Sequence, residues 1–189
     1  MIKIKFEDEF KNYTHSKREE MYKNWNRVLP TNELFFDRWE KAKYLNCGEG
    51  SSIYDTSIIM GKVIIGKNVW IGPFTMIEGI NGKVEIGDNC NISTGVNIYT
   101  HDSSMHVVSG GKLPFKKGDV HIGKNTYIGS MSVIKQNIII GDNCIIGANS
   151  FVNKNIPDNS VAFGIPIKVV GEVINEAGDY KIKYFNSED

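Results

Sequence analysis

The sequence lacks excess charge, abundant cysteine and any long apolar run. Its 189 residues include 22 basic and 22 acidic side chains, which gives no reason to propose a nucleic-acid or anionic-membrane partner. Three cysteines are too few, and odd in number, for a disulfide framework. No apolar run approaches the roughly 20 residues of a membrane span, and the opening residues lack a secretory signal. We therefore expect a cytoplasmic protein with one large domain, or one domain and an appendage.

Aliphatic residues recur every six positions in the second half of the chain, at Ile122, Ile128, Ile134, Ile140, Ile146 and Val152. Residues i and i−2 of a strand point to the same face, so the residue two places before each of these also points inward. Glycine and asparagine follow at fixed offsets and accept left-handed backbone angles readily, which predicts a tight corner after each short strand. A period of six is too short for a βαβ unit or a helical repeat, which leaves a parallel β-helix.

The same period begins near Ser51 and is interrupted twice. Nine residues, in place of six, separate Ile77 from Ile86, so three residues bulge out. Residues 99–119 form a longer excursion, because continuing the period there would bury Lys116. Long insertions of this kind are usually functional or disordered. The predicted organisation is an N-terminal helical segment (1–50), a β-helix (51–171) with the excursion loop 99–119, and a C-terminal tail (172–189) that forms an edge strand or a frayed terminus.

The N-terminal segment has apolar residues at spacings of three and four. This pattern predicts two amphipathic helices separated at Pro30, the second ending near Cys47. Aromatic residues at helical spacing usually belong to a core, so we expect Trp25 and Trp39 to be buried. We expect the helices to pack against the β-helix and to cover its open end.

Several stretches resemble the hexapeptide-repeat acyltransferases, which include maltose, galactoside, xenobiotic and amino-sugar acetyltransferases. The stretches are IGKNVWIGPF, IGDNCNISTGVNIYTHD, SGGK and IGDNCIIGANSFVNKNIPDNSVAFGIPIKVV. The resemblance covers roughly residues 51–171. It implies a left-handed β-helix, a homotrimer, and acyl-CoA bound in the groove between subunits. Left-handed crossovers depart from the usual chirality rule, so the handedness rests on the resemblance alone.

His101 is the predicted general base. Acyl transfer from a thioester requires a group that takes a proton from the attacking hydroxyl or amine, and a neutral imidazole can do this near neutral pH. His101 follows Tyr99 and Thr100 directly, so the last regular strand fixes its position at the start of the excursion. The family's catalytic histidine lies at the start of the same kind of loop.

Glu78 is the predicted partner of His101 or a contact to the acceptor. It stands where the three-residue bulge begins, one coil before His101, and a carboxylate orients the imidazole in other enzymes with a histidine base. Asp102 is the alternative partner. The asparagine that galactoside and maltose acetyltransferases place nearby is absent, and Phe74 stands at the approximate position.

The resemblance implies that the donor, acetyl-CoA, binds at the coil edges of the C-terminal repeats. Small residues there leave room for a pantetheine arm, namely Gly129, Ser130, Gly147 and Ala148. Lys154 and Lys168 are placed to meet phosphates. For the acceptor we predict contacts from the excursion, at Asp102, Ser109 and Gly110. We expect no metal.

The cysteines and the other histidines bear on alternative chemistry. Cys90 and Cys144 occupy inward positions in two GDNC stretches, where buried thiols are inert, so we expect direct transfer without a covalent enzyme intermediate. His101, His106 and His121 raise the alternative of a gamma-type zinc carbonic anhydrase. A non-catalytic β-helix scaffold is the other alternative. The sequence and the resemblance favour acyl-CoA-dependent O- or N-acyl transfer to a sugar or sugar nucleotide.

Overall fold

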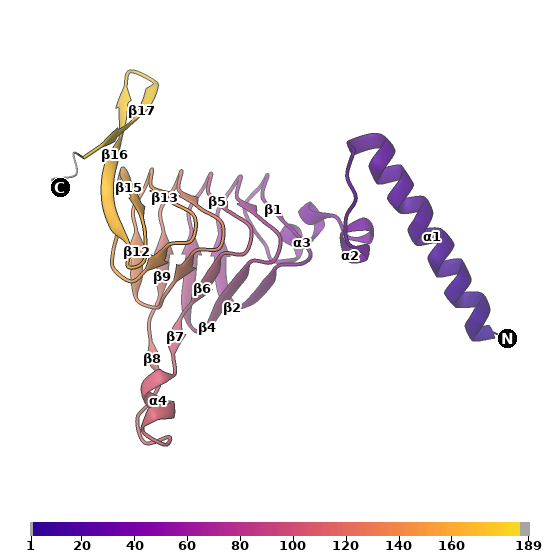
Figure 1. Cartoon of the computed structure of the whole chain (residues 1–189), viewed down its shortest axis with the longest axis horizontal. Coiled ribbons are helices and arrows are strands. Elements are labelled where there is room, and N and C mark those ends of the chain that lie inside the picture. The colour runs from indigo at the N-terminus through magenta and orange to yellow at the C-terminus, as the bar shows by residue number, and fades with distance from the viewer. Residues whose placement is uncertain (1, 186–189) are drawn as a thin grey trace.

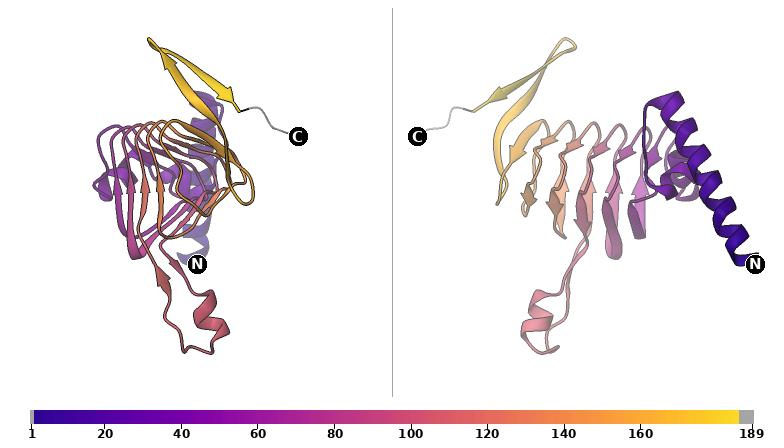
Figure 2. Two further views of the ribbon diagram at one scale, coloured as in Figure 1. Left: turned by 90° about the vertical axis from the view of Figure 1, so that its left-hand side faces the viewer. Right: turned by 45° about the vertical axis from the view of Figure 1, so that its right-hand side comes forward.

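The computed structural model describes residues 2–185 as a mainly β fold of stacked parallel coils (Figure 1). Three helices precede the coils, a long arm leaves their middle, and a β-hairpin follows them. Figure 2 shows the coils stacked along one axis, with the arm and the hairpin projecting from the body. The parallel β-helix predicted from the six-residue period is confirmed, together with the helical N-terminus and the protruding loop.

The coils contribute strands to three faces. On the first face, Ile53, Ile71, Ile92, Ile128 and Ile146 stack in parallel register. Its strands are β1 (Ser52–Ile53), β3 (Trp70–Ile71), β5 (Asn91–Ile92), β10 (Tyr127–Ile128), β13 (Ile145–Ile146) and β15 (Ser160–Phe163).

The longer strands β2 (Ile58–Ile65) and β4 (Met76–Ile86) bend and serve both the second and the third face. The N-terminal half of β4 pairs with β6 (Asn97–Tyr99), and its C-terminal half pairs with β9 (Val120–Ile122). The second face continues through β11 (Val133–Ile134) and β14 (Phe151–Val152), and the third through β12 (Ile138–Ile140).

The core consists of the residues at the six-residue spacing. The six aliphatic residues from Ile122 to Val152 are completely buried, and the residues two positions before them are also inside the coils. Three of these inward residues are polar, and two of them donate hydrogen bonds to the next coil, Thr126 Oγ1 to Gly141 O and Ser132 Oγ to Gly147 O, each at 3.0 Å. Buried hydroxyls are tolerated only when they are bonded in this way.

Asparagines form the corner between the third and first faces, which we call the asparagine corner. All have positive φ, and their side-chain amides bond to one another along the stack at 3.0–3.1 Å: Asn68, Asn89, Asn125, Asn143 and Asn159. Asparagine adopts left-handed angles at lower cost than most residues. Coils meet closely here, since a Cβ on Gly123 would lie 2.5 Å from the carbonyl carbon of Gly141. The sequence pattern therefore has a local structural cause.

The helices differ from the prediction in number and packing. Residues 2–50 contain three helices, α1 (Ile2–Trp25), α2 (Thr31–Phe35) and α3 (Arg38–Tyr44), where two were predicted. Trp25 and Trp39 are 68% and 51% exposed, so the expectation that both are buried is wrong for this chain. Trp25 is exposed because α1 projects away from the coils and contacts α2 (Figure 1). Trp39 lies on α3, where the guanidinium of Arg38 is 4.3 Å from the centroid of its ring. None of the helices within residues 2–185 has the length and hydropathy needed to span a bilayer.

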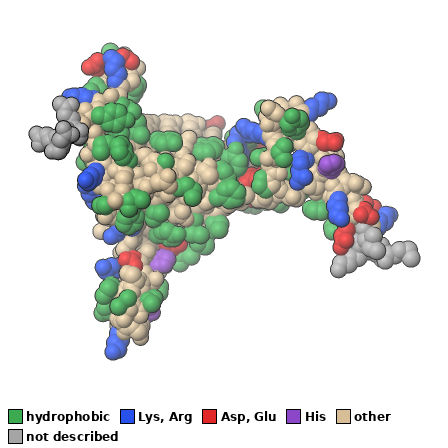
Figure 3. All heavy atoms as spheres, viewed as in Figure 1, with side chains coloured by type: hydrophobic (Ala, Val, Ile, Leu, Met, Phe, Trp, Pro, Cys, Tyr) green, Lys and Arg blue, Asp and Glu red, His purple; other side chains and the backbone are tan. Residues whose placement is uncertain are grey.

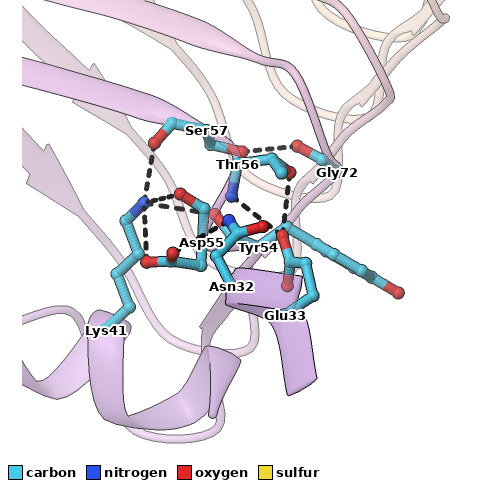
Figure 4. A network of polar contacts seen from close by, with 8 residues as sticks. All are labelled: Asn32, Glu33, Lys41, Tyr54, Asp55, Thr56, Ser57 and Gly72. Carbon is cyan, nitrogen blue, oxygen red and sulfur yellow. Dashed lines mark hydrogen bonds and ion pairs between the residues drawn. The ribbon is translucent and has the colours of Figure 1, made fainter. Parts of the chain in front are cut away.

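The helix α3 covers the first coil, as expected for the open end of the β-helix. Ala42 joins the core, and Lys41 Nζ donates hydrogen bonds to three carbonyl oxygens at the first corner, those of Tyr54 (3.3 Å), Asp55 (2.7 Å) and Ser57 (2.7 Å). Figure 4 shows this network and the carboxylate of Glu33, which accepts from the N–H and the hydroxyl of Thr56. Carbonyl groups at the end of the stack are thereby satisfied.

The other end of the stack is closed by antiparallel strands. β15 pairs with β16 (Lys168–Glu176), which in turn pairs with β17 (Asp179–Tyr184). The tail thus contains an edge strand, one of the two forms expected for it, as far as residue 185. β16 runs across the boundary predicted at residue 171 without interruption.

Candidate active site

Glu78 lies in β4 at the point where the strand leaves the second face. The pairing of β2 with β4 shifts directly after Gly79, which leaves residues 80–82 as a bulge. Glu78 Oε1 accepts hydrogen bonds from the bulge itself, from Ile80 N at 2.6 Å and Asn81 N at 3.2 Å. The three extra residues therefore turn backbone N–H groups toward the carboxylate.

The second carboxylate oxygen of Glu78 faces the start of the excursion. Oε2 accepts from Thr100 N at 3.0 Å and Thr100 Oγ1 at 2.9 Å, and lies 2.9 Å from His101 Nδ1. This contact arises because Glu78 pairs with Tyr99, one coil further along. Glu78 and His101, both predicted as site residues, therefore lie side by side.

The pKa of Glu78 is strongly lowered. Its side chain is only 3% exposed, and this burial alone would raise the pKa. Hydrogen bonds from His101, from the N–H and hydroxyl of Thr100 and from the N–H of Ile80 outweigh the burial and lower the pKa from 4.5 to about 2. Glu78 is consequently a carboxylate at neutral pH, and it can only accept hydrogen bonds.

This carboxylate determines which nitrogen of His101 carries the proton. Because Oε2 is an acceptor, the neutral imidazole donates from Nδ1 and leaves the lone pair on Nε2. The imidazole is partly exposed, and the ring of Phe115 stacks on it with centroids 5.8 Å apart. His101 thus has an oriented ring and an available basic nitrogen, which is the arrangement that a general base requires.

The excursion forms an arm anchored at His101. β7 (His101–Asp102) pairs antiparallel with β8 (Lys116–Lys117), and a short helix α4 (Ser104–Val108) lies beyond them. Its tip exposes apolar side chains, namely Met105, Val107, Val108 and Leu113. Figure 3 shows hydrophobic side chains gathered along this arm. The antiparallel pairing fixes the base of the arm, and the tip stands clear of the coils.

The three residues predicted to contact the acceptor lie at different places on the arm. Asp102 is at its base, where its carboxylate accepts from Ser104 N at 2.8 Å; hydrogen bonds from the Ser104 side chain and backbone lower the pKa of Asp102. Ser109 and Gly110 are near the tip. The Ser109 hydroxyl donates to His106 O and accepts from Leu113 N, so its bonds lie within the arm. Only Asp102 is next to His101.

The small residues predicted for the donor lie at the corner between the first and second faces, which we call the small-residue corner. A Cβ on Gly129 would be 2.4 Å from Ala148 N, and a Cβ on Gly147 would be 2.7 Å from the Cβ of Phe163. Coil stacking alone therefore requires glycine at both positions. This corner also exposes Phe74 and Met131, both with positive φ.

The two predicted lysines are separated. Lys168 pairs with Phe163 in the antiparallel strands, close to the small-residue corner. Lys154 follows β14 at the corner between the second and third faces, where Lys116, Lys117 and Lys135 line the same groove. Within one chain, therefore, the small residues and Lys154 lie at opposite ends of the second face.

The three histidines considered for zinc do not converge. His106 donates from Nδ1 to Leu113 O at 2.6 Å and packs on the edge of Phe115. His121 is exposed on the third face, 3.5 Å from Glu85. In residues 2–185, no three His, Cys, Asp or Glu side chains are grouped so that they could hold a metal ion.

Cys90 and Cys144 are buried inside the coils, as predicted. Desolvation raises the pKa of both thiols, that of Cys90 to about 11. Such thiols are protonated at neutral pH and lack the thiolate needed for nucleophilic attack.

Two residues of the site were not anticipated. Thr100 supplies two of the hydrogen bonds to Glu78, and its position directly before His101 was the available signal. Phe115 comes directly before β8 and stacks on the imidazole. Its position depends on the pairing of β8 with β7, which no repeat in the sequence predicts.

Comparisons with known proteins agree with this architecture. The family model for bacterial transferase hexapeptide (six repeats) matches residues 119–154, and the model for the hexapeptide repeat of succinyl-transferase matches residues 62–100. Galactoside O-acetyltransferase of Escherichia coli (strain K12) is 34% identical over 143 residues, which cover 66% of this chain and 70% of that protein.

Two solved structures are similar over most of the chain. A maltose O-acetyltransferase from Clostridium difficile 630 has 28% identity and a TM-score of 0.57, covering 87% of this chain and 89% of the other. A mutant of AntD, an N-acyltransferase from Bacillus cereus in complex with dTDP and coenzyme A, has 30% identity and a TM-score of 0.61, covering 67% of this chain and 72% of the other. The relatives thus include both O- and N-acyltransferases.

Proposed function

The chain belongs to the hexapeptide-repeat acyltransferases, and from this premise we propose that it transfers an acyl group, preferably acetyl, from acyl-CoA to a hydroxyl or amino group of a sugar or sugar nucleotide. Relatives named for galactoside and maltose O-acetylation, and an N-acyltransferase in complex with dTDP and coenzyme A, support this choice of substrates.

The observation that carries the proposal is the contact between Glu78 and His101. The carboxylate accepts from Nδ1 at 2.9 Å and so leaves Nε2 free to take a proton. As the acceptor oxygen or nitrogen attacks the thioester carbonyl, His101 removes its proton. The imidazolium that forms is stabilised by the ionised Glu78, whose pKa of about 2 keeps it charged.

The same proton completes the reaction. When the carbon–sulfur bond breaks, the imidazolium returns the proton to the departing thiolate, and the neutral base is restored. The protein thiols take no part, because burial raises the pKa of Cys47, Cys90 and Cys144 and keeps all three protonated. Transfer is therefore direct, and one base serves for either a hydroxyl or an amine.

A homotrimer fits the separation of the proposed site residues. The small-residue corner and His101 lie at opposite ends of the second face in one chain. A neighbouring subunit is needed to bring one chain's small-residue corner to the other chain's His101, and acyl-CoA would then lie in the groove between them. The exposed apolar side chains of Phe74 and Met131 on that corner favour contact with another surface.

The test is an assay of CoA release from acetyl-CoA with three separate acceptor classes: free sugars, nucleotide-linked amino sugars and small antibiotics. We expect release with at least one of the sugar classes and a trimer in sedimentation analysis. Release only with the antibiotics would contradict the acceptor assignment. A monomer under assay conditions would remove the groove between subunits.

A further inference from the structure

Phe115 is an aromatic residue of the arm that does not belong to the hydrophobic core. Its side chain is 37% exposed, and the cluster of buried residues inside the coils does not include it. Its ring contacts two imidazoles instead. It stacks on His101 with the centroids 5.8 Å apart and the planes at 21°, and it meets His106 in a T-shaped contact at 4.7 Å and 81°. Packing of the core therefore gives no reason for an aromatic ring at this position.

The base of the arm puts Phe115 on the same face as His101. His101 lies directly opposite Lys117 in the antiparallel pair of β7 and β8, and Asp102 lies opposite Lys116. Alternate residues of a strand point to the same side, so Phe115 points to the side of Lys117 and His101. Diagonal neighbours of this kind are about 7–8 Å apart, within reach of an aromatic side chain. The stack is thus a consequence of the register between the two strands.

A second set of contacts holds Phe115 within the arm. His106 Nδ1 donates a hydrogen bond to Leu113 O at 2.6 Å, and the Ser109 hydroxyl accepts one from Leu113 N at 2.9 Å. These bonds fix the segment directly before Phe115, and they hold the His106 ring against it. The position of Phe115 is therefore set from both sides of the arm, by the pairing of the strands and by the segment that follows α4.

The contact with Glu78 leaves part of the orientation of His101 undetermined. Two torsion angles, χ1 and χ2, set the direction of an imidazole, and the distribution of χ2 is broad. The hydrogen bond between Nδ1 and Glu78 restrains chiefly one distance, 2.9 Å. One combination of the two torsions can therefore change while this distance is kept, and the ring tilts. A fixed direction for Nε2 requires a second restraint.

We propose that Phe115 is a positioning residue that fixes the plane of the His101 imidazole, an inference that rests on the proposed acyl transfer. Offset stacking of two rings is attractive at centroid distances of about 4.5–7 Å, and it opposes the tilt that the hydrogen bond leaves free. The stack does not obstruct proton transfer, because the lone pair of Nε2 lies in the plane of the imidazole and Phe115 covers its face. Glu78 thus selects the tautomer, and Phe115 directs the basic nitrogen.

The kinetic test removes the flat ring and keeps an apolar side chain. Phe115→Met does this, and Phe115→Tyr retains the ring. The matched control is Phe6→Met in α1, because Phe6 also stacks at 21°, on Phe10 with the centroids 6.3 Å apart. We expect Phe115→Met to lower kcat about 10-fold, since a small misplacement of a catalytic group is costly. The KM values for acetyl-CoA and the acceptor should stay within twofold, and the other two variants should keep the wild-type kcat.

Two kinetic outcomes would overturn the proposal. A higher KM for the acceptor with an unchanged kcat would assign Phe115 to acceptor binding. The second outcome comes from adding Phe115→Met to His101→Ala, in which there is no ring to position. The residual rate of this double variant should stay within about twofold of His101→Ala alone. A further tenfold loss would show that Phe115 acts independently of the base.

NMR relaxation separates this inference from the proposed function, because it requires no turnover. The Cδ2–H and Cε1–H groups of His101 report ring motion on the picosecond–nanosecond timescale in the intact protein. We expect greater ring mobility in Phe115→Met and wild-type mobility in Phe115→Tyr and Phe6→Met. This result supports the positioning role even if no acceptor releases CoA and the proposed function fails. Unchanged mobility in Phe115→Met overturns it even if acyl transfer proceeds. Phe115→Leu is the second variant if amide shifts show that Phe115→Met disturbs the pairing of β7 with β8.

Discussion

Strand β4 carries two glutamates that each meet a histidine of a neighbouring strand, Glu78 in its first half and Glu85 in its second half. The two pairs differ in distance, in burial and in the other hydrogen bonds that the carboxylate accepts. Glu78 meets His101 at 2.9 Å in a buried site where backbone N–H groups and Thr100 also bond to the carboxylate. Glu85 meets His121 at 3.5 Å on the exposed third face, and its shorter contact, 2.9 Å, is with Lys83.

The difference lies in the shape of the chain around each pair. His121 lies in the regular strand β9, between the buried residues Val120 and Ile122, and its side chain is on the outer face, so water surrounds it and the pair is screened. His101 stands where the arm leaves the coils, and Glu78 stands where the bulge interrupts β4. Two departures from the repeat in adjacent coils enclose one pair and leave the other on the surface. A contact between a histidine and a carboxylate therefore indicates a catalytic pair only where the surrounding chain buries the carboxylate and orients the ring.

Replacing the two histidines should separate the pairs most clearly. His101→Ala removes the proposed base and should lower kcat/KM about 100- to 10,000-fold. His121→Ala should leave it within twofold, because His121 is exposed and its contact with Glu85 is weak. Steady-state CoA release measures both, and CoA binding by the His101→Ala protein shows that the donor site persists. Equal rates for the two variants would exclude His101 as the base.

The carboxylates provide a second comparison. Glu78→Gln replaces an obligatory acceptor with an amide that can donate to Nδ1, which places the proton on Nε2 and blocks the base. We expect kcat to fall by roughly 10- to 1,000-fold, and the tautomer change to appear in the ¹⁵N chemical shifts of His101. Glu85→Gln is the control, with unchanged kcat. Unaltered kinetics in Glu78→Gln would transfer the orienting role to Asp102.

The pairs should also differ in their effect on stability at low pH. Folding lowers the pKa of Glu78 from 4.5 to about 2, so its contribution is complete above pH 4.5 and is lost as the pH falls from 4.5 toward about 2. Its largest value is about 3 kcal/mol. Urea unfolding across this range should show a steep loss for the wild-type protein and a shallower one for Glu78→Gln. Glu85→Gln should follow the wild-type curve, and coincidence of all three curves would contradict the assignment.

The smallest effect is expected from Thr100. Thr100→Val removes the hydroxyl that donates to Glu78 Oε2 at 2.9 Å and leaves the backbone N–H in place. Losing one such bond costs about 1 kcal/mol, and we expect roughly a fivefold lower kcat. Thr126→Val is matched to it, because it removes a buried hydroxyl bonded to a neighbouring coil. Equal losses of stability with a loss of kcat in Thr100→Val alone would show that the hydroxyl positions Glu78.

The coils were predictable because their period is strict. Each aliphatic residue of the six-residue repeat is buried by the coils above and below it, so the positions of the isoleucines in the sequence predict the core. The contact between Glu78 and His101 has the same origin. Ile77, directly before Glu78, is in register with Ile98, the last residue of the repeat before His101. Residues that keep the repeat, or that lie within a few positions of it, could therefore be located from the sequence.

Features away from the repeat could not be located in this way. α1 is largely charged between residues 5 and 20, so no apolar period marked its start at residue 2. Phe115 reaches His101 only because the arm folds back with β7 against β8. One groove is lined by residues 116, 117, 135 and 154, which the arm and two separate coils bring together. Such contacts depend on the three-dimensional path of a loop, and spacing in the sequence carries no record of it.

The regular pairing of coils fixes the distance between residues on the second face in discrete steps. Adjacent coils are about 4.8 Å apart, and β6, β11 and β14 are successive neighbours on the second face. Lys135 is thus one step from the coil of Tyr99, and Lys154 is two. Deleting one whole coil, the 18 residues that separate Ile128 from Ile146, would keep every remaining register and shorten the stack by one step. The distance from the base of the arm to the antiparallel strands that close the stack is therefore set by a count of coils.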